Sequence, residues 1–195
     1  MKKTAIIAFV LLCLIQLAIP SKMIFDVEQV TLLGQEYRFR TAPIDPEDPF
    51  RGKYVTLEFD AEIYRSAREE EEWSPGEPVY VVLGRDSAGY AIIKTIRKQQ
   101  PEAAEDYILA KIGYVRIDGI RIEYPFKRFY MEENKAPLAE EKYRELNRRS
   151  SGQEVYAVVY VYKGGAALKD VMIDGVSLRV LAGPGLNKVK QIRYI

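Results

Sequence analysis

The sequence contains no histidine. Serine–histidine–aspartate and cysteine–histidine nucleophile systems, imidazole zinc sites and histidine pH switches are therefore excluded together. Cysteine is nearly absent as well: Cys13 is the only one, so no disulfide can form within the chain. Because Cys13 lies inside an apolar N-terminal run, we interpret it as an apolar filler of a membrane helix. The sequence predicts no cofactor.

The chain also lacks an excess of charge of either sign. Its 195 residues include 29 Lys and Arg against 28 Asp and Glu, a formal net charge of +1. Proteins that bind nucleic acid need a basic surface to neutralise phosphates, so this balance argues against a nucleic-acid partner. Hydrophobic residues make up 48% and charged residues 29%, which is the composition of a globular protein with a substantial core.

An apolar run occupies the N-terminus. Residues 1–19 contain two lysines followed by a stretch with only two polar residues, the pattern of a secretory signal. No small-x-small cleavage site precedes or follows Pro20, which favours an uncleaved signal anchor over a cleaved signal peptide. A helix over residues 4–25 would be about 33 Å long, close to the thickness of the bilayer core. Lys2 and Lys3 predict that the N-terminus stays in the cytoplasm.

We therefore expect a single-pass protein of the bacterial cytoplasmic membrane, with an anchor over residues 1–25 and a body in the periplasm or outside. Residues 26–195 are predicted to form a single, mainly β domain, either a barrel or a two-sheet antiparallel sandwich, because turn signals recur every 8–12 residues. One short helix is expected over residues 137–149, where Pro137 suits the first turn. The expected strands cover residues 35–41, 55–63, 79–84, 90–97, 107–117, 120–124, 126–131, 155–162, 166–173 and 176–182.

The strand over residues 55–63 follows a stiff lead-in, and the whole stretch reads IDPEDPFRGKYVTLEFDAEI. Three prolines hold the lead-in extended and remove three backbone donors. In the strand, apolar and polar residues alternate, which predicts one buried and one solvent-facing side. The buried side is expected to comprise Val55, Leu57, Phe59, Ala61 and Ile63. The solvent-facing side is expected to comprise Thr56, Glu58, Asp60 and Glu62.

The stretch Arg51-Gly52-Lys53-Tyr54-Val55-Thr56-Leu57-Glu58-Phe59 resembles the GDYXXLXY family of bacterial membrane-anchored proteins. Gly52, Tyr54 and Leu57 match the motif, while Phe59 replaces its last tyrosine and Lys53 replaces its aspartate. A second stretch, residues 128–133 followed by 138–140, is similar to the aromatic strand and glutamate-bearing helix of that family. The resemblance implies a location in the cell envelope and implies no particular activity.

Two groups of residues near the motif are candidate binding residues. Asp45 and Asp48, with Glu47 between them, offer oxygen ligands to a hard cation, or are turn residues that accept backbone hydrogen bonds. Arg51 and Tyr54 flank Gly52 and would suit an anionic or carbohydrate ligand at the mouth of a barrel. Alternatively, Gly52 permits a tight entry to the strand and Tyr54 packs on a neighbouring strand.

The leading functional hypothesis is a non-enzymatic binding or accessory module that acts on another integral membrane protein. A competing hypothesis is a Ser/Lys hydrolase of the signal-peptidase type, in which Lys94 would activate Ser21 without any histidine. That hypothesis lacks the serine signature and the basic pair of such enzymes. A third hypothesis is a binder of small ligands or carbohydrate near Gly52.

Overall fold

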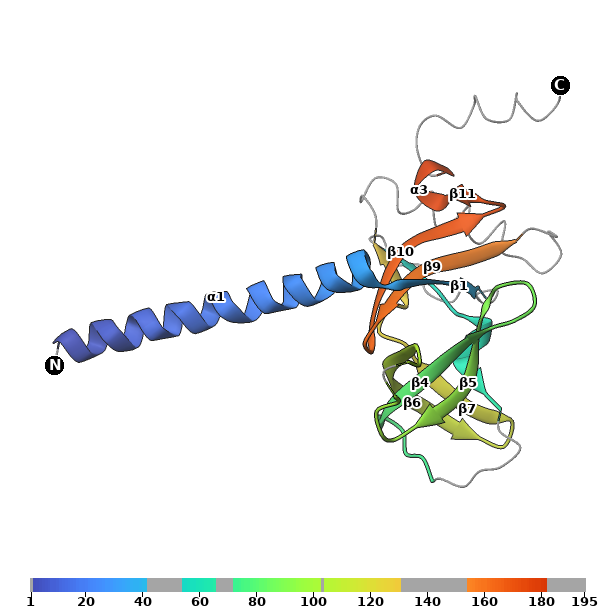
Figure 1. Cartoon of the computed structure of the whole chain (residues 1–195), viewed down its shortest axis with the longest axis horizontal. Coiled ribbons are helices and arrows are strands. Elements are labelled where there is room, and N and C mark those ends of the chain that lie inside the picture. The colour runs from blue at the N-terminus through green and yellow to red at the C-terminus, as the bar shows by residue number, and fades with distance from the viewer. Residues whose placement is uncertain (1, 42–53, 66–71, 103, 131–153, 182–195) are drawn as a thin grey trace.

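A computed structural model of the chain describes residues 2–41, 54–65, 72–102, 104–130 and 154–181. The chain begins with one long helix, α1 (Lys2–Leu33), which projects away from a β-rich body (Figure 1). At 1.5 Å per residue α1 is about 48 Å long. Residues Ile6–Leu33 are long and apolar enough to cross a membrane, and the most apolar part of this segment is not buried against the rest of the protein. The predicted apolar N-terminal helix is confirmed, and it continues without a break to Leu33.

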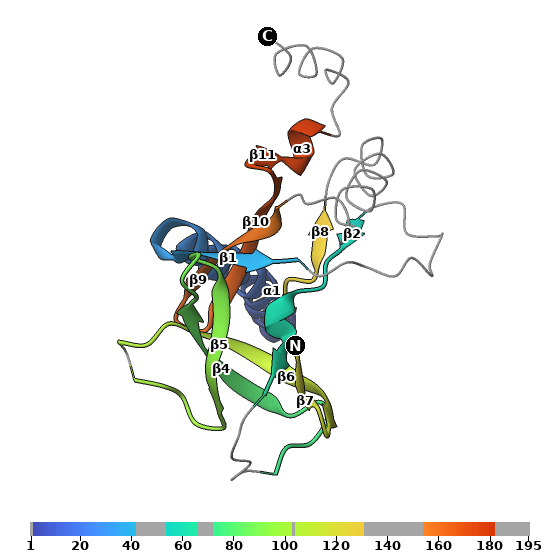
Figure 2. The same cartoon turned by 90° about the vertical axis from the view of Figure 1, so that its right-hand side faces the viewer.

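The body contains eleven short strands in three antiparallel groups among the described residues. The four-stranded sheet has the order β1 (Gln35–Arg40), β9 (Val155–Tyr162), β10 (Gly165–Ile173) and β11 (Val176–Ser177). The five-stranded sheet has the order β3 (Ile63–Tyr64), β7 (Gly119–Glu123), β6 (Tyr107–Arg116), β4 (Pro78–Arg85) and β5 (Ala91–Arg97). The third group pairs β2 (Tyr54–Thr56) with β8 (Arg128–Tyr130), which lie to one side of the larger sheets (Figure 2).

Two isolated bridges join the larger sheets into a nearly closed barrel. Arg38 of β1 bridges Tyr90, which directly precedes β5, and Ile108 of β6 bridges Gly164 in the turn between β9 and β10. The circuit of neighbours therefore runs from β9 through β1, β5, β4 and β6 back to the β9–β10 turn. Closure of this kind leaves few free sheet edges. The predicted fold class, a mainly β barrel-like or two-sheet domain behind an N-terminal helix, is confirmed.

The core lies between the sheets and is centred on aromatic rings. Phe39 of β1 has none of its surface exposed. Its ring centroid lies 5.5 Å from that of Phe59, 5.6 Å from that of Tyr124 and 5.4 Å from that of Phe126, all in edge-to-face geometry. Inward-facing residues of β9, such as Val159, complete this core. Strand β9 lies inside its sheet, between β1 and β10.

The expected long strand over residues 55–63 is wrong in its second half. Strand β2 ends at Thr56, and a 3-10 turn, η1 (Asp60–Glu62), comes before the two-residue strand β3. Within η1, Ala61 leaves the extended conformation with φ −81° and ψ 28°. Leu57, Phe59 and Ala61 are buried as expected, but Glu62 is buried as well instead of facing solvent.

The end of the body also differs from expectation. Residues 176–182 were expected to form one strand, whereas β11 ends at Ser177 and is followed by a short helix, α3 (Leu178–Leu181). The Ser177 hydroxyl accepts a hydrogen bond from the amide of Arg179 at 3.2 Å, as serine does at helix starts. Leu178 is buried in the core. The helix expected over residues 137–149 lies outside the described residues.

The β9–β10 turn offers a matched test of packing at the barrel closure. Gly164 has φ +86°, and a Cβ there would lie 2.8 Å from Tyr107 Cε2; Gly89 has φ +85° but nothing within 4 Å of such a Cβ. We expect Gly89→Ala to lower the free energy of unfolding by about 1–2 kcal/mol through backbone strain alone. Gly164→Ala should lose the same amount and, because of overpacking against Tyr107, about 1–3 kcal/mol of unfolding free energy more. Chemical denaturation of both variants measures the difference. Equal losses of unfolding free energy would show that the β9–β10 turn or Tyr107 shifts to accommodate the added methyl group at no cost.

Candidate functional site

The two stretches that carry the family resemblance are neighbours in space. Strand β2, inside the motif, pairs with β8, and Tyr54 lies opposite Tyr130 in the register. Beyond β2, the amide of Leu57 donates to the carbonyl of Lys127 at 2.8 Å. The side chain of Leu57 has none of its surface exposed and belongs to the core. The motif leucine therefore has a packing role and is not available to a ligand.

The other predicted site residues are not tested by the structure. Asp45, Asp48, Arg51 and Gly52 lie outside the described residues, and Tyr54 is described only in its backbone. The hypotheses of a cation site and of an anion or carbohydrate site at Gly52 thus stay predictions. Among the described residues, no group of three or more acidic or cysteine side chains is placed to hold a metal ion.

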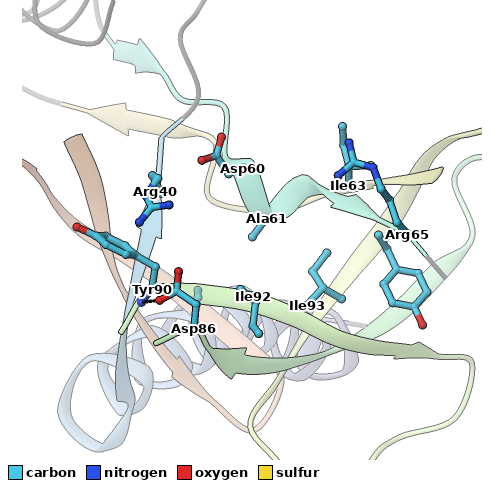
Figure 3. Close-up of a pocket in the computed structure, with 11 residues that line it drawn as sticks. Arg40, Asp60, Ala61, Ile63, Arg65, Asp86, Tyr90, Ile92 and Ile93 are labelled. Atoms are coloured by element: carbon cyan, nitrogen blue, oxygen red, sulfur yellow. Dashed lines mark hydrogen bonds between the residues drawn. The ribbon is translucent and has the colours of Figure 1, made fainter. Parts of the chain in front are cut away.

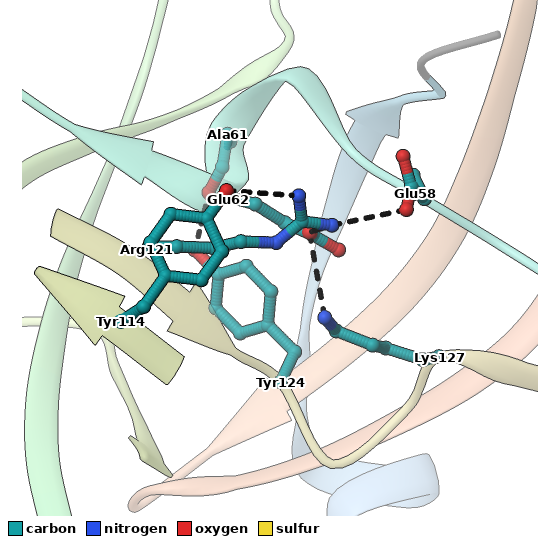
Figure 4. Close-up of polar contacts among 7 residues, drawn as sticks. All are labelled: Glu58, Ala61, Glu62, Tyr114, Arg121, Tyr124 and Lys127. Atoms are coloured by element: carbon teal, nitrogen blue, oxygen red, sulfur yellow. Dashed lines mark hydrogen bonds and ion pairs between the residues drawn. The ribbon is translucent and has the colours of Figure 1, made fainter. Parts of the chain in front are cut away.

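A buried cluster of charges lies directly after the motif (Figure 4). The carboxylate of Glu62 contacts Arg121 Nη2 at 2.8 Å and Lys127 Nζ at 3.4 Å, both through Oε2. Arg121 Nη2 also contacts Glu58 Oε1 at 3.0 Å, and its Nη1 donates to the Tyr114 hydroxyl at 3.4 Å. The four charged residues balance one another, which is the usual condition for burying a charge.

The cluster is strongly desolvated at its centre. Only 2% of the Glu62 side chain is exposed, against 24% of Arg121 and of Lys127. Burial raises the pKa of Glu62 above its ordinary range, and the charges of Lys127 and Arg121 oppose that rise. Burial works in the opposite direction on Arg121, but the Tyr114 hydrogen bond and the two carboxylates raise the pKa of its guanidinium overall.

One atom of the cluster has no described partner. Glu62 Oε1 is buried and accepts no hydrogen bond from any described residue. A neighbouring hydroxyl is already used, because Tyr124 donates to the carbonyl of Ala61 at 2.7 Å (Figure 4). The arrangement joins η1 to β7 through Arg121 and to the chain before β8 through Lys127. Its evident effect is to hold the segment after the motif against the barrel.

A polar hollow of about 290 Å³ is lined by residues of η1 and β5 and by the end of β1 (Figure 3). The guanidinium of Arg40 lies at its rim, 4.2 Å from the centroid of the Tyr90 ring. Asp86 Oδ1 accepts from the amides of Ala88 and Tyr90, so it stabilises the β4–β5 turn. Burial and the hydrogen bond to Glu154 raise the pKa of Tyr90 to about 12. Tyr90 is therefore a neutral phenol at physiological pH.

The candidate pair for a Ser/Lys hydrolase is not assembled by the described residues. Ser21 lies in the exposed part of α1, twelve residues before its end, which corresponds to about 18 Å of helix. Helix α1 packs mainly against β9 and β10, whereas Lys94 lies on β5, where its side chain covers Gly84. No described contact links the two residues.

Sequence reasoning missed the charge cluster altogether. It assigned Glu62 to the solvent-facing side of a strand and gave no role to Arg121 or Lys127. Lys127 is 65 positions from Glu62 along the chain, so no local periodicity connects them. The only available signal was an acidic residue close to a family motif.

Comparison with known proteins gives one result. A family described as GDYXXLXY protein matches residues 16–171 of the chain. This range includes the second half of α1, the motif and the strands β1 to β9. It also includes β10 except for the last two residues of that strand. No curated protein and no solved structure matches the chain.

Proposed function

Since the chain belongs to the GDYXXLXY protein family, we propose that it is a membrane-anchored envelope protein whose body serves another integral membrane protein as a non-enzymatic accessory module. The observation that carries the proposal is α1. Its apolar side chains are exposed along nearly its whole length, for example Leu11, Leu17 and Phe25. Such a surface is stable in a bilayer and unfavourable in water.

The proposed orientation follows from charge. Lys2 and Lys3 precede the apolar stretch and favour retention of the N-terminus in the cytoplasm. The body would then fold in the periplasm or outside the cell. Because the chain has a single cysteine, it can form no internal disulfide, and folding in an oxidising compartment carries no risk of wrong internal pairing.

Fractionation tests the location. After alkaline carbonate extraction of membranes we expect the full chain in the pellet, since an inserted helix resists extraction. In spheroplasts, added protease should digest the body from outside the cytoplasmic membrane. Recovery of the full-length protein in the soluble cytosolic fraction would overturn the proposed location.

Native complexes test the accessory role. Mild detergent extraction after cross-linking in cells should yield a complex that contains this chain and an integral membrane protein in a fixed ratio. A chain that runs as a monomer after cross-linking, at its natural level, would contradict the accessory role and leave the membrane location standing.

A further inference from the structure

Helix α1 meets the body at one defined place, the outer face of the β9–β10 hairpin (Figure 1). Val30 is 8% exposed, and a Cβ on Gly165 would lie 2.7 Å from its Cγ2. The helix ends at Leu33, and Gln35, the first residue of β1, pairs with Val161. The tip of the β9–β10 hairpin therefore lies beside the end of the helix.

The outer face of this hairpin carries tyrosines and lysines. Val159 and Val161 face the core, so Tyr160 and Tyr162 face outward, where both are half-buried. Lys163 follows at the turn with its Nζ 5.2 Å from the Tyr162 ring centroid. We call Tyr160, Tyr162, Lys163 and Lys169 the hairpin patch.

Lys169 belongs to the hairpin patch because of a bulge. The register of β10 against β9 shifts between Leu168 and Asp170, which leaves Lys169 unpaired in the ladder. Its Nζ donates to the Tyr160 hydroxyl at 2.7 Å and lies 4.7 Å from the centroid of that ring. The Tyr160 ring and the Lys169 ammonium group therefore lie together on the outer face of the hairpin.

Two carboxylates near the hairpin patch, those of Glu36 and Asp170, offset part of the charge of Lys169. Glu36 forms an ion pair with Arg38 at 3.6 Å, and Asp170 accepts a hydrogen bond from the amide that follows it. Arg179 adds a positive charge, since its guanidinium donates to the Lys169 carbonyl at 3.4 Å. Three cations, Lys163, Lys169 and Arg179, therefore stand against these two carboxylates around the hairpin patch.

The hairpin patch lies on the side of the body that would face a bilayer, because α1 joins the body there. A hydrocarbon core of about 30 Å takes about 20 residues of helix, and apolar side chains remain exposed beyond that length. Leu32 is 73% exposed and Leu33 is 60% exposed, at the last turn before the body. Because α1 is about 18 Å longer than the hydrocarbon core, the body lies beyond that core, with these leucines and the hairpin patch on the side that would face the bilayer.

We propose that the hairpin patch binds the anionic phospholipid headgroups of the bilayer that α1 crosses, an inference that rests on the proposed membrane location. Tyrosine is favoured at the membrane–water interface, where its ring is apolar and its hydroxyl is hydrated. Lysines near an anionic surface strengthen binding by roughly fivefold each. The bilayer contact would fix the tilt of the body relative to α1.

Fluorescence quenching in vesicles tests this contact with the full chain. Trp73 is the only tryptophan, so Tyr162→Trp in a Trp73→Phe background reports on the hairpin patch alone. The control probe is Ser87→Trp in the same background, on the β4–β5 turn at the opposite end of the body (Figure 1). In vesicles containing brominated phosphatidylcholine and one third phosphatidylglycerol, we expect strong quenching at position 162 and little at position 87.

Charge reversal then tests the lysines. Lys163→Glu with Lys169→Glu should lower the ratio of docked to undocked body at least about 25-fold and abolish the quenching at position 162. The matched control is Lys94→Glu with Lys111→Glu, two exposed lysines elsewhere on the body, which should leave the quenching unchanged.

The outcomes separate this proposal from the proposed function. If the protein floats with vesicles but position 162 is not quenched, the proposed lipid contact is wrong and the membrane location stands. The hairpin patch would then be a candidate surface for a protein partner. If quenching is equal in purely zwitterionic vesicles or survives the charge reversal, recognition of anionic headgroups is wrong. If the full chain does not float with vesicles at all, the proposed membrane location itself fails.

Discussion

Replacing Arg121 by methionine is expected to lower the free energy of unfolding by about 3–5 kcal/mol. Arg121 supplies the shorter of the two contacts to Glu62, 2.8 Å against 3.4 Å for Lys127. Without it, a carboxylate with 2% of its side chain exposed keeps only the more distant cation. A buried charge that loses its main partner is among the most destabilising single changes.

Denaturant titration of the full chain in detergent micelles, followed by Trp73 fluorescence, measures this loss. The matched control is Arg116→Met, because Arg116 is exposed and lies 4.5 Å from the same Tyr114 ring without an ion pair to any described residue. That variant should lose at most about 0.5 kcal/mol. Equal stability of the two variants would show that the buried cluster contributes nothing.

A double variant identifies the cause. Glu62→Leu combined with Arg121→Met removes both the buried carboxylate and its partner, and hydrophobic replacement of buried ion pairs is often neutral. We therefore expect the double variant to recover most of the stability lost by Arg121→Met alone. If the double variant is as unstable as the single one, the loss comes from the packing of the arginine stem and not from an uncompensated charge.

The strands of the body could be predicted because their signals are local. The expected segments over residues 79–84 and 90–97 correspond to β4 and β5 within one or two residues. Those over residues 107–117 and 120–124 correspond equally well to β6 and β7. Alternation of side chains and the turn residues between strands decide these elements within a few positions of sequence.

The segment after the motif was mispredicted because its conformation depends on distant residues. Alternation correctly identified Leu57 and Phe59 as inward-facing, but it extended the strand through η1. Burial of Glu62 is favourable only where Arg121 and Lys127 meet it. Long-range ion pairs of this kind leave no periodic trace, so the candidate site required the three-dimensional structure.

Replacing Phe39 by alanine is expected to lower the free energy of unfolding by about 3–5 kcal/mol. The ring is completely buried and lies within 5.6 Å, centroid to centroid, of three other aromatic rings. Removing it leaves a cavity and also abolishes edge-to-face contacts worth about 0.5–1.5 kcal/mol for each pair. Phe39→Leu fills most of the volume and should lose clearly less.

The position of Phe39 gives this loss a wider consequence. Phe39 lies on β1, which directly follows α1, and it packs on Phe59 of the motif and on Tyr124 after β7. The alanine variant should therefore loosen the motif segment, and hydrogen exchange of the Leu57 amide, which donates to the Lys127 carbonyl, should accelerate together with that of β1. The control is Ile117→Ala, because Ile117 is exposed at the β6–β7 turn and lies outside the core. If Phe39→Ala accelerates exchange in β1 alone, the aromatic core does not couple the anchor to the motif.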